Sequence, residues 1–150
     1  MKNLPGLKYQ PAIDALDLSI KCPNNFTLLK EEEEVYRVAI NPLTHIKNFL
    51  PNVLFDQACG ITYFDYSKAN VDENGKCERC GASFHKTYKK AKSVLEHFSR
   101  KNKENIGYDC VAKGTLNADD GLVKIKSGHI TLYEFNNGNS LAEKFKIVTE

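Results

Sequence analysis

The residues GLVKIKSGHITLYEF, numbered 121–135, decide the fold of this chain. Two runs within this stretch, 122–126 and 129–135, are rich in β-branched and aromatic residues and alternate apolar with polar side chains. The pair Ser127-Gly128 between them is a two-residue link of the kind that closes a tight hairpin. The sequence therefore predicts two antiparallel strands at this point.

Further strands are predicted on both sides of the hairpin. Residues 108–112 precede it, and together with the hairpin they give a C-terminal three-stranded meander. Residues 35–40 alternate in the same way, and residues 61–64 and 146–149 are short runs of β-forming residues. These runs predict an antiparallel sheet.

Helical periodicity is clearest over residues 87–103. Apolar side chains recur there three or four positions apart, at Tyr88, Ala91, Val94, Leu95 and Phe98. Shorter helices are predicted at 12–20 and 43–50. The expected fold class is α+β, with one long amphipathic helix packed on the sheet.

The length of 150 residues is typical of one domain. Prolines at 5, 11 and 23 interrupt the first 30 residues, so we expect an irregular N-terminal arm over 1–30 and a single domain over 31–150. No run approaches the roughly 18 apolar residues that a spanning helix needs, so no membrane partner is expected. The five cysteines are an odd number in a chain large enough for its own core, which favours free thiols or metal ligands over a disulfide framework, and a cytoplasmic location.

A cysteine motif stands at residues 77–85, with the spacing Cys77-x2-Cys80-x4-His85. Zinc is held by four nitrogen or sulfur ligands in a tetrahedron, and this motif supplies three of them. Cys59 is the nearest further ligand in the sequence, and Cys110 is the next choice. The pattern predicts a structural zinc site of Cys59, Cys77, Cys80 and His85; the alternatives are free thiols or a redox-active Cys-x-x-Cys.

Lysines cluster at the start of the predicted long helix. Lys86, Lys89, Lys90 and Lys101 lie away from its apolar stripe, so they face solvent. Several cations on one helix face can contact the charged groups of a polyanion. The alternative is an ordinary solvated helix face.

The triplet His129-Ile130-Thr131 lies on a predicted strand, where His129, Thr131 and Tyr133 share one face. It is similar to the second His-x-Thr motif of the 2H phosphoesterases. That resemblance implies hydrolysis of a phosphodiester, such as a cyclic nucleotide or an RNA end, by His129 and Thr131. The other triplet, His85-Lys86-Thr87, precedes a helix and is followed by lysines, which departs from the family's pattern.

Taken together, these features favour a small intracellular binding domain, stabilised by one zinc ion, that contacts a polyanion or a protein partner. The alternatives are a 2H-like phosphoesterase and an accessory protein with no ligand.

Overall fold

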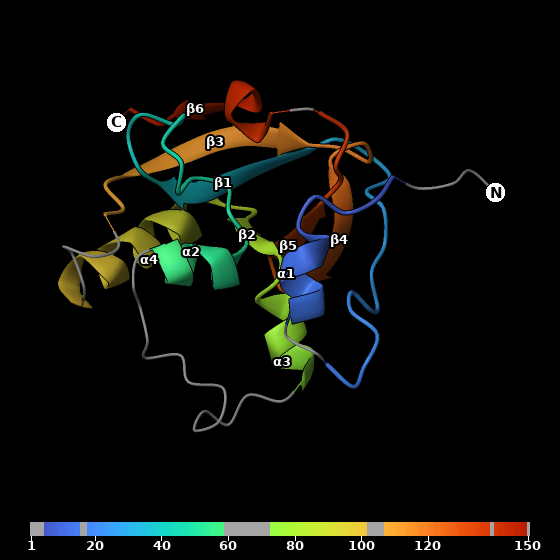
Figure 1. Cartoon of the computed structure of the whole chain (residues 1–150). Helices are drawn as coiled ribbons and strands as arrows, with labels where there is room; N and C mark the ends of the chain where they lie inside the picture. The colour runs from blue at the N-terminus through green and yellow to red at the C-terminus, as the bar shows by residue number, and fades with distance from the viewer. Residues whose placement is uncertain (1–4, 16–17, 59–72, 102–106, 139, 150) are drawn as a thin grey trace.

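The computed structural model describes residues 5–15, 18–58, 73–101, 107–138 and 140–149. Its strands are β1 (Glu33–Ala39), β2 (Ala82–His85), β3 (Cys110–Leu116), β4 (Gly121–Lys126), β5 (His129–Glu134) and β6 (Phe145–Ile147). They form one antiparallel sheet in the order β4-β5-β2-β1-β3-β6. Figure 1 shows β4 and β5 running across the direction of β1 and β3, so the sheet is strongly twisted. The predicted α+β class with an antiparallel sheet is confirmed.

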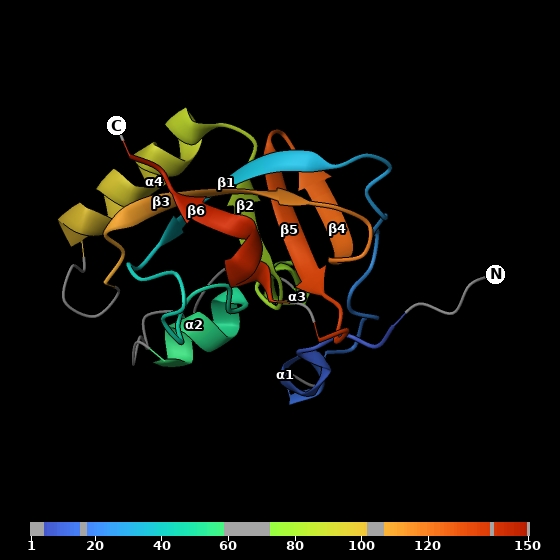
Figure 2. The same ribbon diagram turned by 90° about the horizontal axis from the view of Figure 1, so that it is seen from above.

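The helical elements are α1 (Gln10–Ala15), α2 (Asn52–Ala58), α3 (Glu73–Glu78), α4 (Tyr88–Lys101) and the 3-10 turn η1 (Leu141–Lys144). Figures 1 and 2 show α1 and α3 beside the N-terminal arm, away from α4. In Figure 1, α2 and α4 lie below β1 and β3, and η1 and β6 lie above them. Among the described helices, none combines the length and the apolar character that crossing a membrane requires.

The hairpin of β4 and β5 lies where the sequence predicts it, with Lys126 opposite His129 in the register. Ser127 and Gly128 have φ values of 49° and 83°, and positive φ at both link residues is typical of a hairpin turn whose twist matches the strands. The consecutive C-terminal strands β3, β4 and β5 are all present. β3 pairs with β1 and β6, while β4 pairs with β5.

One face of the sheet carries the main core. Side chains that alternate along the strands meet there, and Phe84, Ile130 and Val123 are fully buried. Leu29, Phe49 and Leu141, which come from loops and η1, close this core. We call this side the inner face of the sheet and the side that carries His129 and Thr131 the outer face.

A second apolar cluster joins the arm to the sheet. Ile13 of α1 packs with Cys77 and Cys80 near α3, and with Leu122 and Tyr133 on the hairpin. The backbone of the arm also bridges the sheet at two points, Leu7 with Phe135 and Thr27 with Val123. Residues 5–15 and 18–30 are therefore anchored along the edge of the fold.

The helix α4 covers the outer face of the central strands, where it contacts β1, β2 and β3. Ala91 of α4 is fully buried on the side of the helix that faces the sheet. The ring of Tyr88 packs edge to face against that of Tyr36 on β1, with the ring centroids 6.1 Å apart. The hydroxyl of Thr87 accepts a hydrogen bond from the backbone N–H of Lys90 at 3.2 Å, which caps the start of the helix.

One predicted helix is absent, and one predicted strand lies outside the described residues. Residues 43–50 form turns instead of a helix, because the Asn48 side chain bonds the backbone of Ile40 and Pro42 and so competes with helical hydrogen bonding. The short helix α3 begins at Glu73, whose carboxylate accepts hydrogen bonds from Ser19 and Ile20. The strand predicted at 61–64 lies outside the described residues.

Candidate functional site

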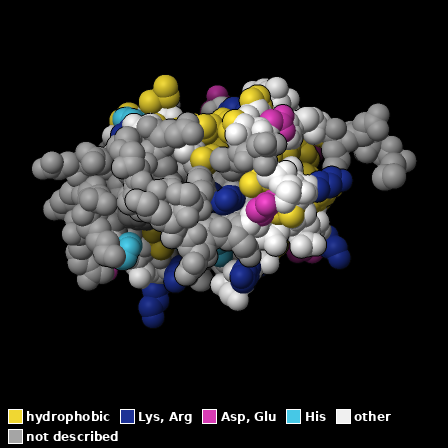
Figure 3. Space-filling view, turned by 60° about the horizontal axis from the view of Figure 1, so that its bottom comes forward, with side chains coloured by type: hydrophobic (Ala, Val, Ile, Leu, Met, Phe, Trp, Pro, Cys, Tyr) yellow, Lys and Arg dark blue, Asp and Glu magenta, His cyan; other side chains and the backbone are white. Residues whose placement is uncertain are grey.

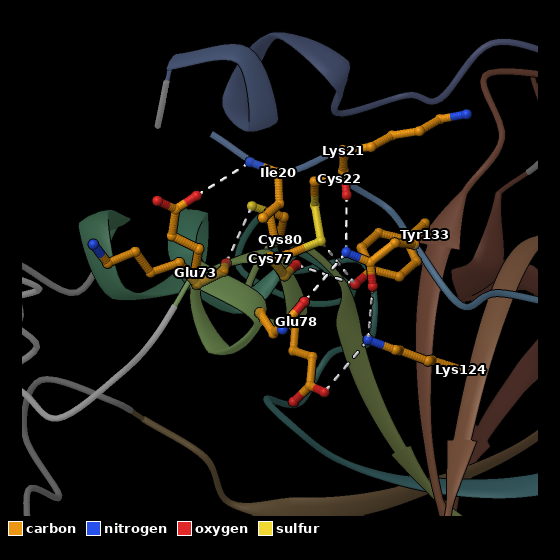
Figure 4. Close-up of a disulfide and its surroundings, with 12 residues drawn as sticks. Ile20, Lys21, Cys22, Glu73, Cys77, Glu78, Cys80, Lys124 and Tyr133 are labelled. Atoms are coloured by element: carbon orange, nitrogen blue, oxygen red, sulfur yellow. Dashed lines mark hydrogen bonds and ion pairs between the residues drawn. A yellow bond between two sulfur atoms is a disulfide. The ribbon is translucent and has the colours of Figure 1, made fainter. Parts of the chain in front are cut away.

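A disulfide between Cys22 and Cys77 links the N-terminal arm to α3, with the two Cα atoms 5.7 Å apart (Figure 4). The hydroxyl of Tyr133 on β5 donates a hydrogen bond to the backbone carbonyl of Cys77 at 3.1 Å. Glu73 of the same helix bonds the backbone of Ser19 and Ile20, close to Cys22 along the chain. The bridge is therefore embedded in contacts that hold the arm, α3 and the hairpin together.

This disulfide overturns the predicted zinc site. A sulfur bonded to another sulfur is no thiolate, so Cys77 is not available as a zinc ligand. His85 points to the outer face beside His129, and Cys59 lies outside the described residues. Among the residues that the structure describes, no group of three or more His, Cys, Asp or Glu side chains could hold a metal ion. The zinc-binding prediction is wrong, because Cys-x2-Cys spacing does not show whether a thiol meets a metal or a distant cysteine.

The Cys80 thiol near the bridge is disfavoured as a thiolate. Cys80 is buried, and desolvation raises the pKa of its thiol to about 11. Its sulfur lies 3.5 Å from the Lys76 carbonyl, at the C-terminal end of α3. Helix N-termini, not C-termini, lower thiol pKa values, so this Cys-x-x-Cys lacks the setting of a redox-active pair.

A pocket of about 360 Å³ opens on the outer face beside this bridge. It is lined by His129 and Thr131 of β5 and by consecutive residues of the edge strand β4, which are Val123, Lys124, Ile125 and Lys126. Asn25 and Thr27 of the arm form one wall, and Glu78 of α3 contributes to another; we call this cavity the outer pocket. Cys22 and Cys77 belong to the segments that carry these walls, so the disulfide ties the walls to each other.

Cations from two distant parts of the sequence surround this pocket. Lys126 is exposed opposite His129, while Lys124 is held by Glu78 at 3.6 Å and by Asn24 at 3.4 Å. Desolvation lowers the pKa values of both His85 and His129, and the charge of Lys90, at the start of α4, adds to this lowering. The hairpin and the start of the basic helix therefore contribute to one positively charged region.

The two histidines of the His-x-Thr triplets face each other across β2 and β5. Their ring centroids are 5.4 Å apart, and the two residues are opposite in the register. His85 is buried, and its Nδ1 has no hydrogen-bond partner among the described atoms. Desolvation, helped by His129, Lys90 and Arg37, lowers the pKa of His85 to about 4, so its ring is neutral near pH 7.

The threonines of the two triplets have different surroundings. Thr131 lies opposite Ser83 and lines the outer pocket. Thr87 caps α4 and so lies beyond the end of β2. Tyr133 is buried, and its hydroxyl is bonded to Cys77.

The predicted polyanion-binding lysines are exposed where they are described. Lys86, Lys89 and Lys90 all face solvent, and the side chain of Lys101 lies outside the described part of the structure. The face of the molecule shown in Figure 3 carries no such cluster of lysines, because acidic and basic side chains are interspersed among its described residues.

Sequence reasoning missed Cys22, Glu78, Lys124 and Lys126. The lysines had a usable signal, because positions 124 and 126 on one strand of a hairpin share a face with 131 and 129 on the other. Comparisons of the chain with protein-family models, with curated proteins and with solved structures found no match.

The buried His85 should make the fold sensitive to acid. Its folded-state pKa lies below the usual value near 6.5, so the unfolded chain takes up a proton first as the pH falls. This contribution to stability is present above about pH 6.5 and declines toward pH 4, by roughly 3 kcal/mol. Urea unfolding at pH 7 and pH 4.5 should therefore show a smaller decline in His85→Gln than in the wild type. The matched variant His97→Gln should decline as the wild type does, and an undiminished decline in His85→Gln would contradict the account.

Proposed function

We propose that this protein binds a polyanion through the outer pocket and the lysines at the start of α4. The observation that carries the proposal is the meeting of Lys124 and Lys126 with His129 and Thr131 in one pocket. Cations that converge on one cavity fit an anionic group better than cations spread evenly over a surface.

The side chains of the pocket contribute to anion binding in different ways in this proposal. The ammonium group of Lys126 supplies charge within the pocket, the exposed Lys90 supplies charge at the start of α4, and His129 and the Thr131 hydroxyl supply hydrogen bonds. The exposed Lys86 and Lys89 extend the charged surface beyond the pocket, so further anionic groups of the same polymer can be contacted there. Glu78 opposes anion binding in part, but its ion pair with Lys124 partly offsets its charge.

We further infer that binding takes place in a compartment where disulfides persist, in contrast to the predicted cytoplasmic location. The inference rests on Cys22–Cys77, since structural disulfides are rare where cellular thiols are kept reduced.

Heparin provides a direct test of polyanion binding. Lys90→Glu and Lys126→Glu should each raise the dissociation constant about 3- to 10-fold at low salt, and the wild-type affinity should fall steeply as salt rises. Lys146→Glu, which makes the same charge change on an exposed residue of β6, should have little effect. Equal weakening by all three variants, or binding that ignores salt, would show that only net charge matters.

A second candidate function is a 2H-like phosphoesterase, and the approach of the His85 and His129 rings to 5.4 Å favours it. The likeness departs from the family's pattern at Thr87, which caps α4, and at His85, whose ring is buried.

Hydrolysis of a 2′,3′-cyclic nucleotide tests this second candidate. The wild type should release the ring-opened monophosphate, and His129→Ala should abolish turnover while the protein stays folded, because general acid–base catalysis needs the imidazole. A wild type that hydrolyses no cyclic nucleotide between pH 5 and pH 9 would eliminate the enzyme and leave polyanion binding unaffected.

A further inference from the structure

A second, larger cavity lies apart from the outer pocket and shares no lining residue with it. It has a volume of about 570 Å³, within the range of small-molecule sites. Its lining comes from residues 8–9 of the arm, from the turns at 43–50, and from residues 134–136, 138 and 140–142. We call it the inner cleft.

Glu134, the last residue of β5, supplies a buried carboxyl group to the inner cleft. Its side chain is 7% exposed, and its ion-pair partner among the described residues is Lys8, whose ammonium lies 3.5 Å from Oε2. No described residue donates a hydrogen bond to the other oxygen, Oε1. A carboxylate can accept about four hydrogen bonds, so Oε1 is open to hydrogen bonds from solvent or a ligand.

The surroundings of Glu134 leave its charge only partly compensated. Desolvation raises the pKa of its carboxyl, while Lys8 and Arg37 act in the opposite direction and Asp120 adds to the rise. Lys8 is a weak partner, because its side chain is 43% exposed and its contact with the carboxylate is long. Arg37 instead donates hydrogen bonds to the carbonyls of Ser83 and Leu50.

The ammonium of Lys8 also lies 5.5 Å from the centroid of the Tyr9 ring, within the range of a cation–π contact. Lys8 therefore lies between a carboxylate and an aromatic ring, which is the way proteins commonly hold an organic cation. Apolar side chains from Leu43, Phe49 and Leu141 line the cleft near these groups.

Each class of ligand meets this arrangement differently. An anion would meet the buried carboxylate of Glu134, and a purely apolar molecule would leave Oε1 desolvated and unpaired, which is costly. A cation with an apolar body would satisfy Oε1 and contact the apolar wall. The buried guanidinium of Arg37 opposes it, but is not among the residues that line the cleft, and its carbon lies 5.7 Å from the centroid of the Phe49 ring.

We propose that the inner cleft binds small organic ammonium ions, whose charged group replaces the Lys8 ammonium beside Glu134 while the apolar part contacts Leu43, Phe49 and Leu141. In the free protein Lys8 then acts as an internal competitor for the site.

Two substitutions with opposite expected effects test this proposal. Phenethylamine is the probe, and 3-phenylpropionate, which pairs a similar ring and chain with a negative charge, is the control ligand. Titration followed by NMR at pH 7 should show binding of the amine alone. Glu134→Gln should abolish this binding, and Lys8→Gln should tighten it about 3- to 10-fold by removing the competitor.

Glu32→Gln makes the same chemical change at an exposed position, so its affinity for the amine should equal that of the wild type. Equal binding of the two ligands, retained binding in Glu134→Gln, or no binding in both the wild type and Lys8→Gln would overturn the proposal. Unchanged affinity in Lys8→Gln would overturn the role of Lys8. None of these results depends on polyanion binding, because the outer pocket has different residues.

Discussion

The covalent bond between Cys22 and Cys77 joins two segments that lie 55 residues apart in the sequence. A crosslink that closes a loop of this length lowers the entropy of the unfolded chain, which corresponds to about 4 kcal/mol of stability. Its local effect is to keep the arm against α3 and the hairpin, where the second apolar cluster forms. Small elements such as the six-residue α3 have little stability of their own, so this attachment matters for their position.

Both candidate sites use residues of the arm that this bond anchors. Asn25 and Thr27 form a wall of the outer pocket, and Lys8 and Tyr9 line the inner cleft. The sheet contributes to the two cavities from opposite faces, since His129 and Thr131 point outward while the Glu134 carboxyl lines the cleft. The anchored N-terminal arm therefore supplies part of the lining of both the outer pocket and the inner cleft.

The hairpin was predictable because its information is local. Alternation along 129–135 and the Ser127-Gly128 link are readable in any window of the sequence, and the structure has Ile130 and Leu132 buried in the core. The strand β2 was not predicted because the cysteine motif led us to interpret residues 77–85 as a metal-binding loop. The alternation of Ala82 and Phe84 with Ser83 and His85 would have indicated a strand. The partner of Cys77 was beyond such reasoning, since Cys22 lies in an irregular segment whose position depends on tertiary contacts.

Disulfide mapping of the purified protein tests this account most directly. Free thiols are alkylated before cell lysis, the protein is digested without reductant, and the peptides are sequenced by mass spectrometry. We expect a crosslinked pair of peptides that contain Cys22 and Cys77, and its disappearance on reduction. Recovery of Cys77 as an alkylated thiol, or joined to any cysteine other than Cys22, would contradict the account.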